Sequence, residues 1–230
     1  MRVRMAAVEV DHVAVEQRLL DDALRPGAAV LDAGCGRTTR LRFYRDRIER
    51  LVGVDADEPA GRENPSVDEF VHANLDERLP FDDASFDLVY ANFVVEHLDD
   101  PAGAFADWRR LLRPDGRVVI VTSNRASPAM ALGARLPNRV RLGIKRRGAG
   151  AAEEDVYPTR YRANTPAALA EATEAGGLEP VAVELVGTLH RYAARVPVVP
   201  AALQALEGML PEKRRSTIVA SYRARTFESC

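Results

Sequence analysis

The sequence predicts an α/β protein in which strands and helices alternate around one mostly parallel sheet. Short apolar runs recur along the first half of the chain, and charged segments with helical spacing of apolar residues separate them. Such alternation is typical of a doubly wound parallel sheet. A third observation is the stretch Asp32-Ala33-Gly34-Cys35-Gly36, which follows the first apolar run and predicts a tight turn between a buried strand and a helix.

Composition limits the remaining possibilities. The 230 residues are 47% hydrophobic and carry a formal net charge of −2, so we expect a single domain without a global basic surface for nucleic acid. The two cysteines, Cys35 and Cys230, argue against a disulfide framework or a thiolate metal site. No apolar run approaches the roughly 18 residues of a membrane span, and the N-terminus does not resemble a signal peptide. We therefore expect a cytoplasmic protein without a metal site.

The elements expected in the first half of the chain follow from spacing and turn residues. Residues 9–24 predict an amphipathic helix that ends at Arg25-Pro26-Gly27. Pro101 opens a helix whose Phe105, Trp108, Leu111 and Leu112 form a core-facing stripe, and a turn follows at 113–116. The remaining elements up to residue 122 are strands at about 28–33, 51–55, 70–72, 86–91 and 117–122, a helix at about 38–49 and a loop at 76–85.

The pattern loosens between residues 123 and 164, and we interpret this stretch as an insertion that caps the carboxyl edge of the sheet. Thr165-Pro166 then predicts a helix start and Gly176-Gly177 its end. The last expected elements are a strand at 181–186, a helix at 200–214 and a strand at 217–222.

The glycine stretch predicts a nucleotide-type loop, and two ligand classes compete for it. A dinucleotide site requires Gly-x-Gly-x-x-Gly, but Thr39 stands at the third glycine position. Asp32 stands two residues before Gly34, where it would repel a pyrophosphate. Asp55 ends the second strand, where a carboxylate can accept hydrogen bonds from both ribose hydroxyls. The second pattern fits a nucleoside ligand without a pyrophosphate.

Five motifs in order resemble the class I S-adenosylmethionine-dependent methyltransferases, in the subgroup that often methylates small molecules. They are Val30–Gly36, Val52–Asp55, Leu79–Val89, Glu96–Pro101 and Leu111–Arg117. The match covers about 9–124, and the unit from Thr165 onward also resembles the end of the family's domain. Thr38 departs from the family, which often has a third glycine there.

The resemblance implies a Rossmann-like, doubly wound sheet of seven strands, mostly parallel with an antiparallel last strand and with helices on both faces. It implies one methyltransferase domain over residues 1–230. Within it, we expect a cofactor-binding core at 9–124, an inserted lid or substrate segment at 125–164 and a closing helix-strand unit at 165–230.

The resemblance also assigns roles in binding S-adenosylmethionine. Gly34 and Gly36 would let the backbone pass beside the methionine and ribose, Asp32 would orient the methionine amino group, and Asp55 would bind the ribose diol. Asn74 and Leu75 would contact the adenine, with Asp76 as the rival, and Asn92 would lie where the methyl group points. The full cofactor set is Asp32, Ala33, Gly34, Cys35, Gly36, Asp55, Ala56, Asn74, Leu75 and Asn92.

Two further groups of residues are candidates on the acceptor side. His97 has the residue type of a general base, although an equivalent Glu-His pair in the family also serves capping or packing. Tyr157, Arg160 and Tyr161 are candidates for contacts with the substrate, and a tyrosine-anchored loop packed on the sheet edge is the structural alternative.

A basic run, Arg135 to Arg147, lies in the expected insertion. It would suit an anionic substrate, a carrier-protein surface, RNA or a membrane face, and a solvated helix face is the plainer alternative. Glu153, Glu154 and Asp155 follow and would partly neutralise it.

The function implied is methyl transfer from S-adenosylmethionine to oxygen, nitrogen or carbon of a small molecule, with S-adenosylhomocysteine as product. Methyl transfer from a sulfonium is an in-line displacement that depends mainly on alignment, so no catalytic dyad is required. The alternatives are methylation of RNA or protein, and a binding protein that keeps the cofactor fold without turnover.

Overall fold

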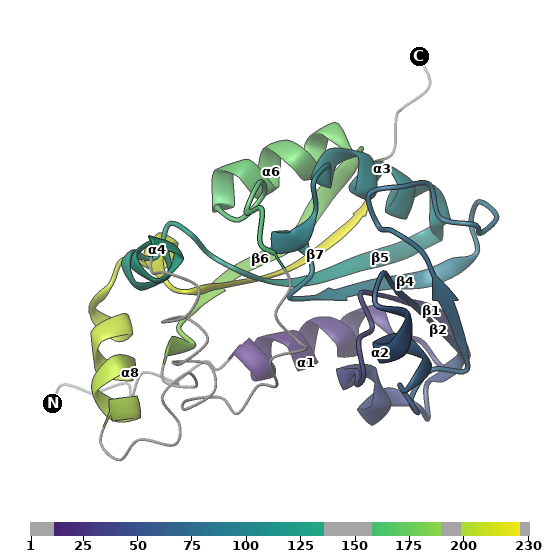
Figure 1. Ribbon diagram of the computed structural model, residues 1–230, viewed down its shortest axis with the longest axis horizontal. Coiled ribbons are helices and arrows are strands. Elements are labelled where there is room, and N and C mark those ends of the chain that lie inside the picture. Colours follow the sequence, from purple (N-terminus) through teal and green to yellow (C-terminus); the bar gives the residue numbers. More distant parts are fainter. Residues whose placement is uncertain (1–11, 136–157, 190–198, 226–230) are drawn as a thin grey trace, which may run out of the picture.

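The computed structural model describes residues 12–135, 158–189 and 199–225 (Figure 1). Within them, seven strands form one sheet in the order β3-β2-β1-β4-β5-β7-β6. Strands β1 to β5 pair in parallel, whereas β7 is antiparallel to both β5 and β6. The predicted mixed sheet with an antiparallel last strand is thereby confirmed. The strands are β1 Ala28–Ala33, β2 Ile48–Asp55, β3 Glu69–His72, β4 Phe86–Asn92, β5 Leu112–Ser123, β6 Leu178–Val186 and β7 Thr217–Ala224.

Helices cover both faces of this sheet. In Figure 1, α3 and α6 lie above it and α1 lies below it. The α-helices of the described residues are α1 His12–Ala23, α2 Glu58–Arg62, α3 Pro101–Leu111, α4 Pro128–Arg135, α6 Pro166–Ala175 and α8 Val199–Met209. Three short 3-10 helices are η1 Arg40–Tyr44, η2 Val95–His97 and η4 Glu212–Arg214.

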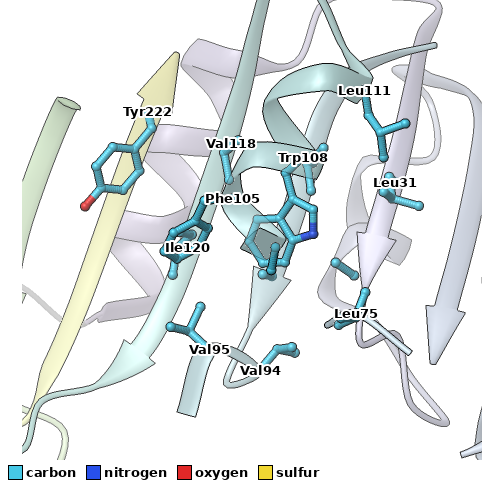
Figure 2. Packing of buried hydrophobic residues seen from close by; sticks show 14 of the residues in the cluster. Leu31, Leu75, Val94, Val95, Phe105, Trp108, Leu111, Val118, Ile120 and Tyr222 are labelled. Atoms are coloured by element: carbon cyan, nitrogen blue, oxygen red, sulfur yellow. The ribbon is translucent and has the colours of Figure 1, made fainter. Parts of the chain in front are cut away.

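The α3 face carries the larger aromatic core. Phe105 and Trp108 of α3 are fully buried, and their rings meet edge to face with centroids 5.2 Å apart. They pack over Leu31, Val118 and Ile120 of the central strands (Figure 2). Phe105, Trp108 and Leu111 are the apolar stripe that the spacing of the helix predicts, but Leu112, which was expected in that stripe, begins β5. Burial of the stripe packs α3 against β1 and β5.

The α1 face combines apolar packing with one buried polar cluster. Glu16 of α1 is 1% exposed, and it accepts a hydrogen bond from the Tyr90 hydroxyl of β4. The Arg40 Nε lies 2.8 Å from the other Glu16 oxygen. Because a buried carboxylate requires a partner, this cluster joins α1 to β4 and to η1, the 3-10 helix that follows the glycine loop.

The predicted helix at 38–49 is wrong. Only η1 is helical there: the Thr39 side chain accepts from Leu41 N at its start, and Arg47 N bonds to Tyr44 O after its end. Ile48 already belongs to β2, where it lies opposite Ala28 of β1. Its apolar side chain is buried as a strand residue rather than as part of a helical stripe.

Other boundaries differ in smaller ways. The turn expected at 113–116 is a bulge within β5, because the register passes from Leu112 to Arg117 while β4 advances only from Phe86 to Leu88. The helix expected at 200–214 ends at Met209, and η4 follows it after a break at residues 210 and 211. The predicted caps of α6 are confirmed: the Thr165 side chain accepts from Ala168 N, and Gly176 and Gly177 end the helix. Residues 9–11, Cys230 and most of the basic run lie outside the described residues.

Candidate functional site

The carboxyl ends of β1, β2 and β4 meet at one edge of the sheet. Strand β1 has β2 on one side and β4 on the other, so the chain reverses its direction of winding between β1 and β4. In open α/β sheets, ligands bind at such a reversal, outside the carboxyl ends of the strands. Asp32, Asp55 and Asn92 stand at or next to the ends of these three strands.

The glycine loop is held to the end of β2 by its own backbone. The amides of Gly34 and Cys35 both bond to Val54 O, at 2.7 and 3.1 Å, and Gly36 N donates to Asp55 Oδ2 at 2.8 Å. Gly34 has φ +79° and Gly36 has φ +46°, a region that side chains disfavour. A Cβ on Gly36 would meet nothing within 4 Å, so the loop opens away from the protein at that point.

Asn64 holds the carbonyl side of the glycine loop, and it was not among the residues predicted from the sequence. It is 4% exposed, and its Nδ2 donates to the carbonyls of Cys35 and Gly36 at 3.0 and 3.1 Å. In the sequence, Asn64 stands before Pro65 and is typical of a turn. The spacing to the glycine loop, 28 residues away, carries no signal of this contact.

Asp32 is 2% exposed, and its Oδ2 has no hydrogen-bond partner within the described residues. Burial raises the pKa of its carboxyl from the usual 3.8 to about 7. A hydrogen bond from Thr39 opposes that rise, and the neighbouring Asp55 carboxylate adds to it. A buried acceptor without a donor is costly, so this oxygen is the point at which a ligand donor would be bound most favourably.

Asp55 is half-buried and holds two backbone amides. Its Oδ2 accepts from Gly36 N and its Oδ1 from Asp57 N, each at 2.8 Å. Each carboxylate oxygen has two lone pairs, so both can still accept from a diol. Cys35 is 2% exposed, and burial raises the pKa of its thiol to about 12, which excludes it as a nucleophile near neutral pH.

The residues expected at the adenine follow β3. Leu75 is buried, and Asn74 is exposed with its Oδ1 accepting from Asp76 N at 3.1 Å. Asp76 Oδ1 accepts from the amides of Asp99 and Asp100, at 2.9 and 2.8 Å. Asp76, the rival candidate, therefore joins this loop to the start of α3.

The end of β4 leads directly into η2. Asn92 is half-buried, and His97 of η2 lies with its Nδ1 2.7 Å from Pro158 O. A carbonyl only accepts hydrogen bonds, so Nδ1 carries the hydrogen in this contact. Two of the substrate candidates, Arg160 and Tyr161, lie beside η2, and Tyr157 lies outside the described residues.

The remaining cofactor candidates contribute mainly backbone. Ala33 is fully buried in β1, and the exposed Ala56 accepts at its carbonyl from His72 Nε2 at 3.1 Å. Across the described ranges, no cluster of three or more His, Cys, Asp or Glu side chains has the arrangement of a metal site. No helix in the same part of the chain is long and apolar enough to cross a membrane.

These residues fit a nucleoside-type cofactor that carries an amine. The unpartnered Asp32 oxygen supplies an acceptor for the amine, the open side of Gly36 leaves room for a ligand beside the loop, and Asp55 supplies a diol acceptor. The two carboxylates belong to adjacent parallel strands, so one ligand can span them.

Comparisons with known proteins find methyltransferases. The family described as "Methyltransferase domain" matches residues 31–120. A malonyl-[acyl-carrier protein] O-methyltransferase of Pseudescherichia vulneris is 35% identical over 126 residues, which cover 51% of this chain and 50% of that protein. The chain thus matches about half the length of this relative.

Two solved structures share the fold across most of the chain. An S-adenosylmethionine-dependent methyltransferase from Mesorhizobium loti has a TM-score of 0.62 at 20% identity, covering 91% of this chain and 95% of the other. Geranyl diphosphate C-methyltransferase from Streptomyces coelicolor has a TM-score of 0.62 at 17% identity, covering 93% and 80%. At these identities the likeness shows the fold.

The two loop glycines differ in the space around them, which gives a first prediction. A Cβ on Gly34 would lie 2.3 Å from Val94 Cγ2, whereas one on Gly36 would meet nothing. Both positions have positive φ. We expect Gly34→Ala to cost about 1–3 kcal/mol more unfolding free energy than Gly36→Ala, as overpacking does. Urea denaturation measures the difference. Adding Val94→Ala to Gly34→Ala should recover part of the loss, and equal costs for the two alanines would contradict the steric explanation.

The raised pKa of Asp32 gives a second prediction. The folded protein binds a proton at Asp32 between about pH 4 and 7 that the unfolded chain does not, so this stabilising contribution is lost as the pH rises through about 7. Asp32→Asn removes that dependence. We expect the variant to match wild type near pH 4 and to be more stable by a few kcal/mol above pH 7. Denaturant unfolding from pH 4 to 8.5 tests this, and a pH-independent difference between the two proteins would refute it.

Proposed function

We propose that this chain, which is similar to the class I S-adenosylmethionine-dependent methyltransferases, transfers the methyl group of S-adenosylmethionine to a small-molecule acceptor and releases S-adenosylhomocysteine. The observation that carries the proposal is the pairing of a buried Asp32, whose Oδ2 has no partner within the described residues, with Asp55 on the adjacent strand. The glycine loop between them opens outward at Gly36.

Each residue of this edge has a defined task. Asp32 accepts from the amino group of the cofactor, and this cation keeps the Asp32 carboxyl ionised at neutral pH. Asp55 accepts from the ribose hydroxyls while it continues to hold Gly36 N. Asn74 and Leu75 border the adenine, since Asp76 is engaged with the start of α3. Ala33, Gly34, Cys35 and Ala56 line the same edge with backbone atoms.

The cofactor supplies a methyl group on a positively charged sulfur. The protein's part is to hold the acceptor in line with that methyl group and to exclude water, because alignment is the main source of rate in such a displacement. Asn92 ends β4, the strand that pairs with β1, and we propose that it borders the reacting atoms. Its amide is neutral, which suits a reaction in which the sulfonium charge is lost.

The acceptor class rests on two observations. Malonyl-[acyl-carrier protein] and geranyl diphosphate are the methyl acceptors after which two of the similar proteins are named. The formal net charge of −2 disfavours RNA as an acceptor. Arg160 and Tyr161 belong to the segment before α6, and we propose that this segment and the rest of 125–164 select the acceptor.

Cofactor binding is the first test of the function. Calorimetry with S-adenosylmethionine and S-adenosylhomocysteine should detect both ligands in wild type. We expect Asp55→Ala to weaken binding roughly tenfold or more, since a buried diol loses its acceptor. The matched control is Asp68→Ala, because Asp68 also accepts a backbone amide, Leu51 N at 2.7 Å, but lies just before β3 at the opposite edge.

The control should bind both ligands as wild type does. Absence of binding by wild type at millimolar ligand would end every form of the proposal. Turnover on a panel of phenols, amines, carboxylates and carrier-bound acids, with none on RNA or protein, would separate small-molecule methylation from its alternatives. Binding without turnover on any acceptor would favour a protein that only binds the cofactor.

For acceptors that must lose a proton, we propose His97 as the general base. Its Nδ1 hydrogen is held by Pro158 O, which fixes the orientation of the ring. His97→Asn keeps a donor for Pro158 but removes the base. We expect kcat to fall by about 10²–10⁴. A variant with wild-type kcat would leave His97 as a packing residue.

A further inference from the structure

Glu96 is a buried carboxylate that the proposed chemistry does not use. It is 6% exposed and belongs to η2, directly after β4. Its Oε2 accepts from Thr122 Oγ1 at 2.7 Å, and its Oε1 accepts from Ser123 Oγ at 3.4 Å. Thr122 and Ser123 are the last residues of β5. The side chain of Glu96 therefore joins the segment after β4 to the carboxyl end of β5.

The backbone of Glu96 holds a second segment. Its carbonyl accepts from Arg160 N at 2.7 Å and from Tyr161 N at 3.0 Å. The side chain of His97, the next residue, donates from Nδ1 to Pro158 O at 2.7 Å. Residues 158–164, which we call the wall segment, are thus fastened along η2 by consecutive hydrogen bonds.

Asn164 closes the arrangement from the other end of the wall segment. It is 1% exposed, and its Nδ2 donates to Thr122 Oγ1 at 2.7 Å and to Ser123 O at 3.0 Å. The Thr122 hydroxyl has a single hydrogen, which it donates to Glu96, so it can only accept from Asn164. The chain of hydrogen bonds runs in one direction, from Asn164 through Thr122 to Glu96, and it requires an acceptor at its end.

Side chains of the wall segment extend the same attachment at the surface. Arg160 and Arg162 both pair with Asp99, at 3.1 and 3.5 Å. The Arg125 guanidinium lies 4.9 Å from the centre of the Tyr161 ring. Tyr161 itself has φ +55°, a backbone conformation that persists only where its surroundings impose it.

The position of the wall segment points to its role. It crosses the carboxyl ends of β4 and β5, and the cofactor residues occupy the ends of β1 and β2 on the same edge. Asn92, at the end of β4, lies between the two halves. A segment fixed there borders the space that an acceptor must enter to reach the methyl group.

We propose that Glu96 is a positioning residue that fastens the wall segment across β4 and β5, so that this segment forms the acceptor-side wall of the site. The inference rests on the proposed function for the identity of the acceptor, but the attachment itself is a property of the fold. Burial raises the pKa of the Glu96 carboxyl, and the hydrogen bond from Thr122 opposes that rise. Because burial disfavours the charged form, replacing Glu96 by the neutral isostere Gln is a mild substitution.

Four variants of the full chain separate positioning from simple destabilisation. Glu96→Gln keeps an oxygen for Thr122 and offers its amide to Ser123 Oγ. Glu96→Leu removes the acceptor, and Thr122→Val removes the hydroxyl shared by Glu96 and Asn164. The matched control is Thr173→Val, because Thr173 is equally buried but its hydroxyl bonds to Leu169 O and Ala170 O of its own helix.

Amide hydrogen exchange reads the attachment directly. We expect the amides of Arg160 and Tyr161 to exchange roughly tenfold faster or more in Glu96→Leu and Thr122→Val, and at the wild-type rate in Glu96→Gln and Thr173→Val. For an acceptor that the enzyme is found to methylate, Glu96→Leu and Thr122→Val should raise the KM of the acceptor and leave the KM for S-adenosylmethionine unchanged.

The outcomes are distinct. Unchanged exchange at Arg160 and Tyr161 in folded Thr122→Val, or Glu96→Gln behaving like Glu96→Leu, would overturn the proposed role of Glu96. Faster exchange with an unchanged acceptor KM would show that Glu96 fastens the wall segment but would overturn the proposal that this segment borders the acceptor. Failure of wild type to bind S-adenosylmethionine in calorimetry would reject the function and leave the exchange result standing.

Discussion

The structure depends on the burial of one carboxylate, Asp32, at the end of the central strand. Strand β1 has neighbours on both sides and helices over both faces, so the Asp32 side chain has little access to water. Its Oδ2 receives no donor from the described residues. An unmatched buried acceptor is unfavourable for folding, and it is tolerated where a ligand supplies the missing donor. Among the described residues, the neighbouring elements leave that oxygen without a donor of their own.

Two buried polar contacts preserve this arrangement. Asn64 holds the carbonyls of Cys35 and Gly36. The loop amides are bonded to Val54 O and to Asp55, so the glycine loop gives Asp32 no amide of its own. On the α1 face, the Glu16 carboxylate is satisfied by Tyr90 and Arg40. Tyr90 lies directly opposite Asp32 in the pairing of β4 with β1, yet its hydroxyl is committed to Glu16. The nearest phenol is thereby withheld from Asp32.

Most of the fold could be predicted from the sequence, because strand and helix periods and cap residues act locally. Trp108 and Phe105 at helical spacing, and Thr165-Pro166 before α6, specify their elements without tertiary information. The helix expected at 38–49 failed because Ile48 fits a helical stripe and a strand equally well, and only its pairing with Ala28 decides between them. Asn64, Thr122 and Asn164 could not be identified as supports of the site, since their partners lie 26 to 42 residues away and polar residues in loops carry no periodic signal.

Asp32 and Glu96 show how two buried carboxylates on one edge can serve different purposes. Both follow or end central strands, and burial raises the pKa of each. Glu96 accepts hydrogen bonds from two hydroxyl groups of β5, so the cost of burying its carboxylate is offset within the protein. We therefore assign it the role of holding other groups in place. Asp32 has one oxygen without a donor among the described residues, so a ligand that donates to it would offset the cost of its burial.

The difference lies in the residues that end the neighbouring strand. Strand β5 ends in Thr122-Ser123, whose hydroxyls donate to Glu96, whereas β2 ends in Asp55, which places a second acceptor beside Asp32. Two acceptors side by side attract a ligand with several donors, and an amine with a ribose diol is such a ligand.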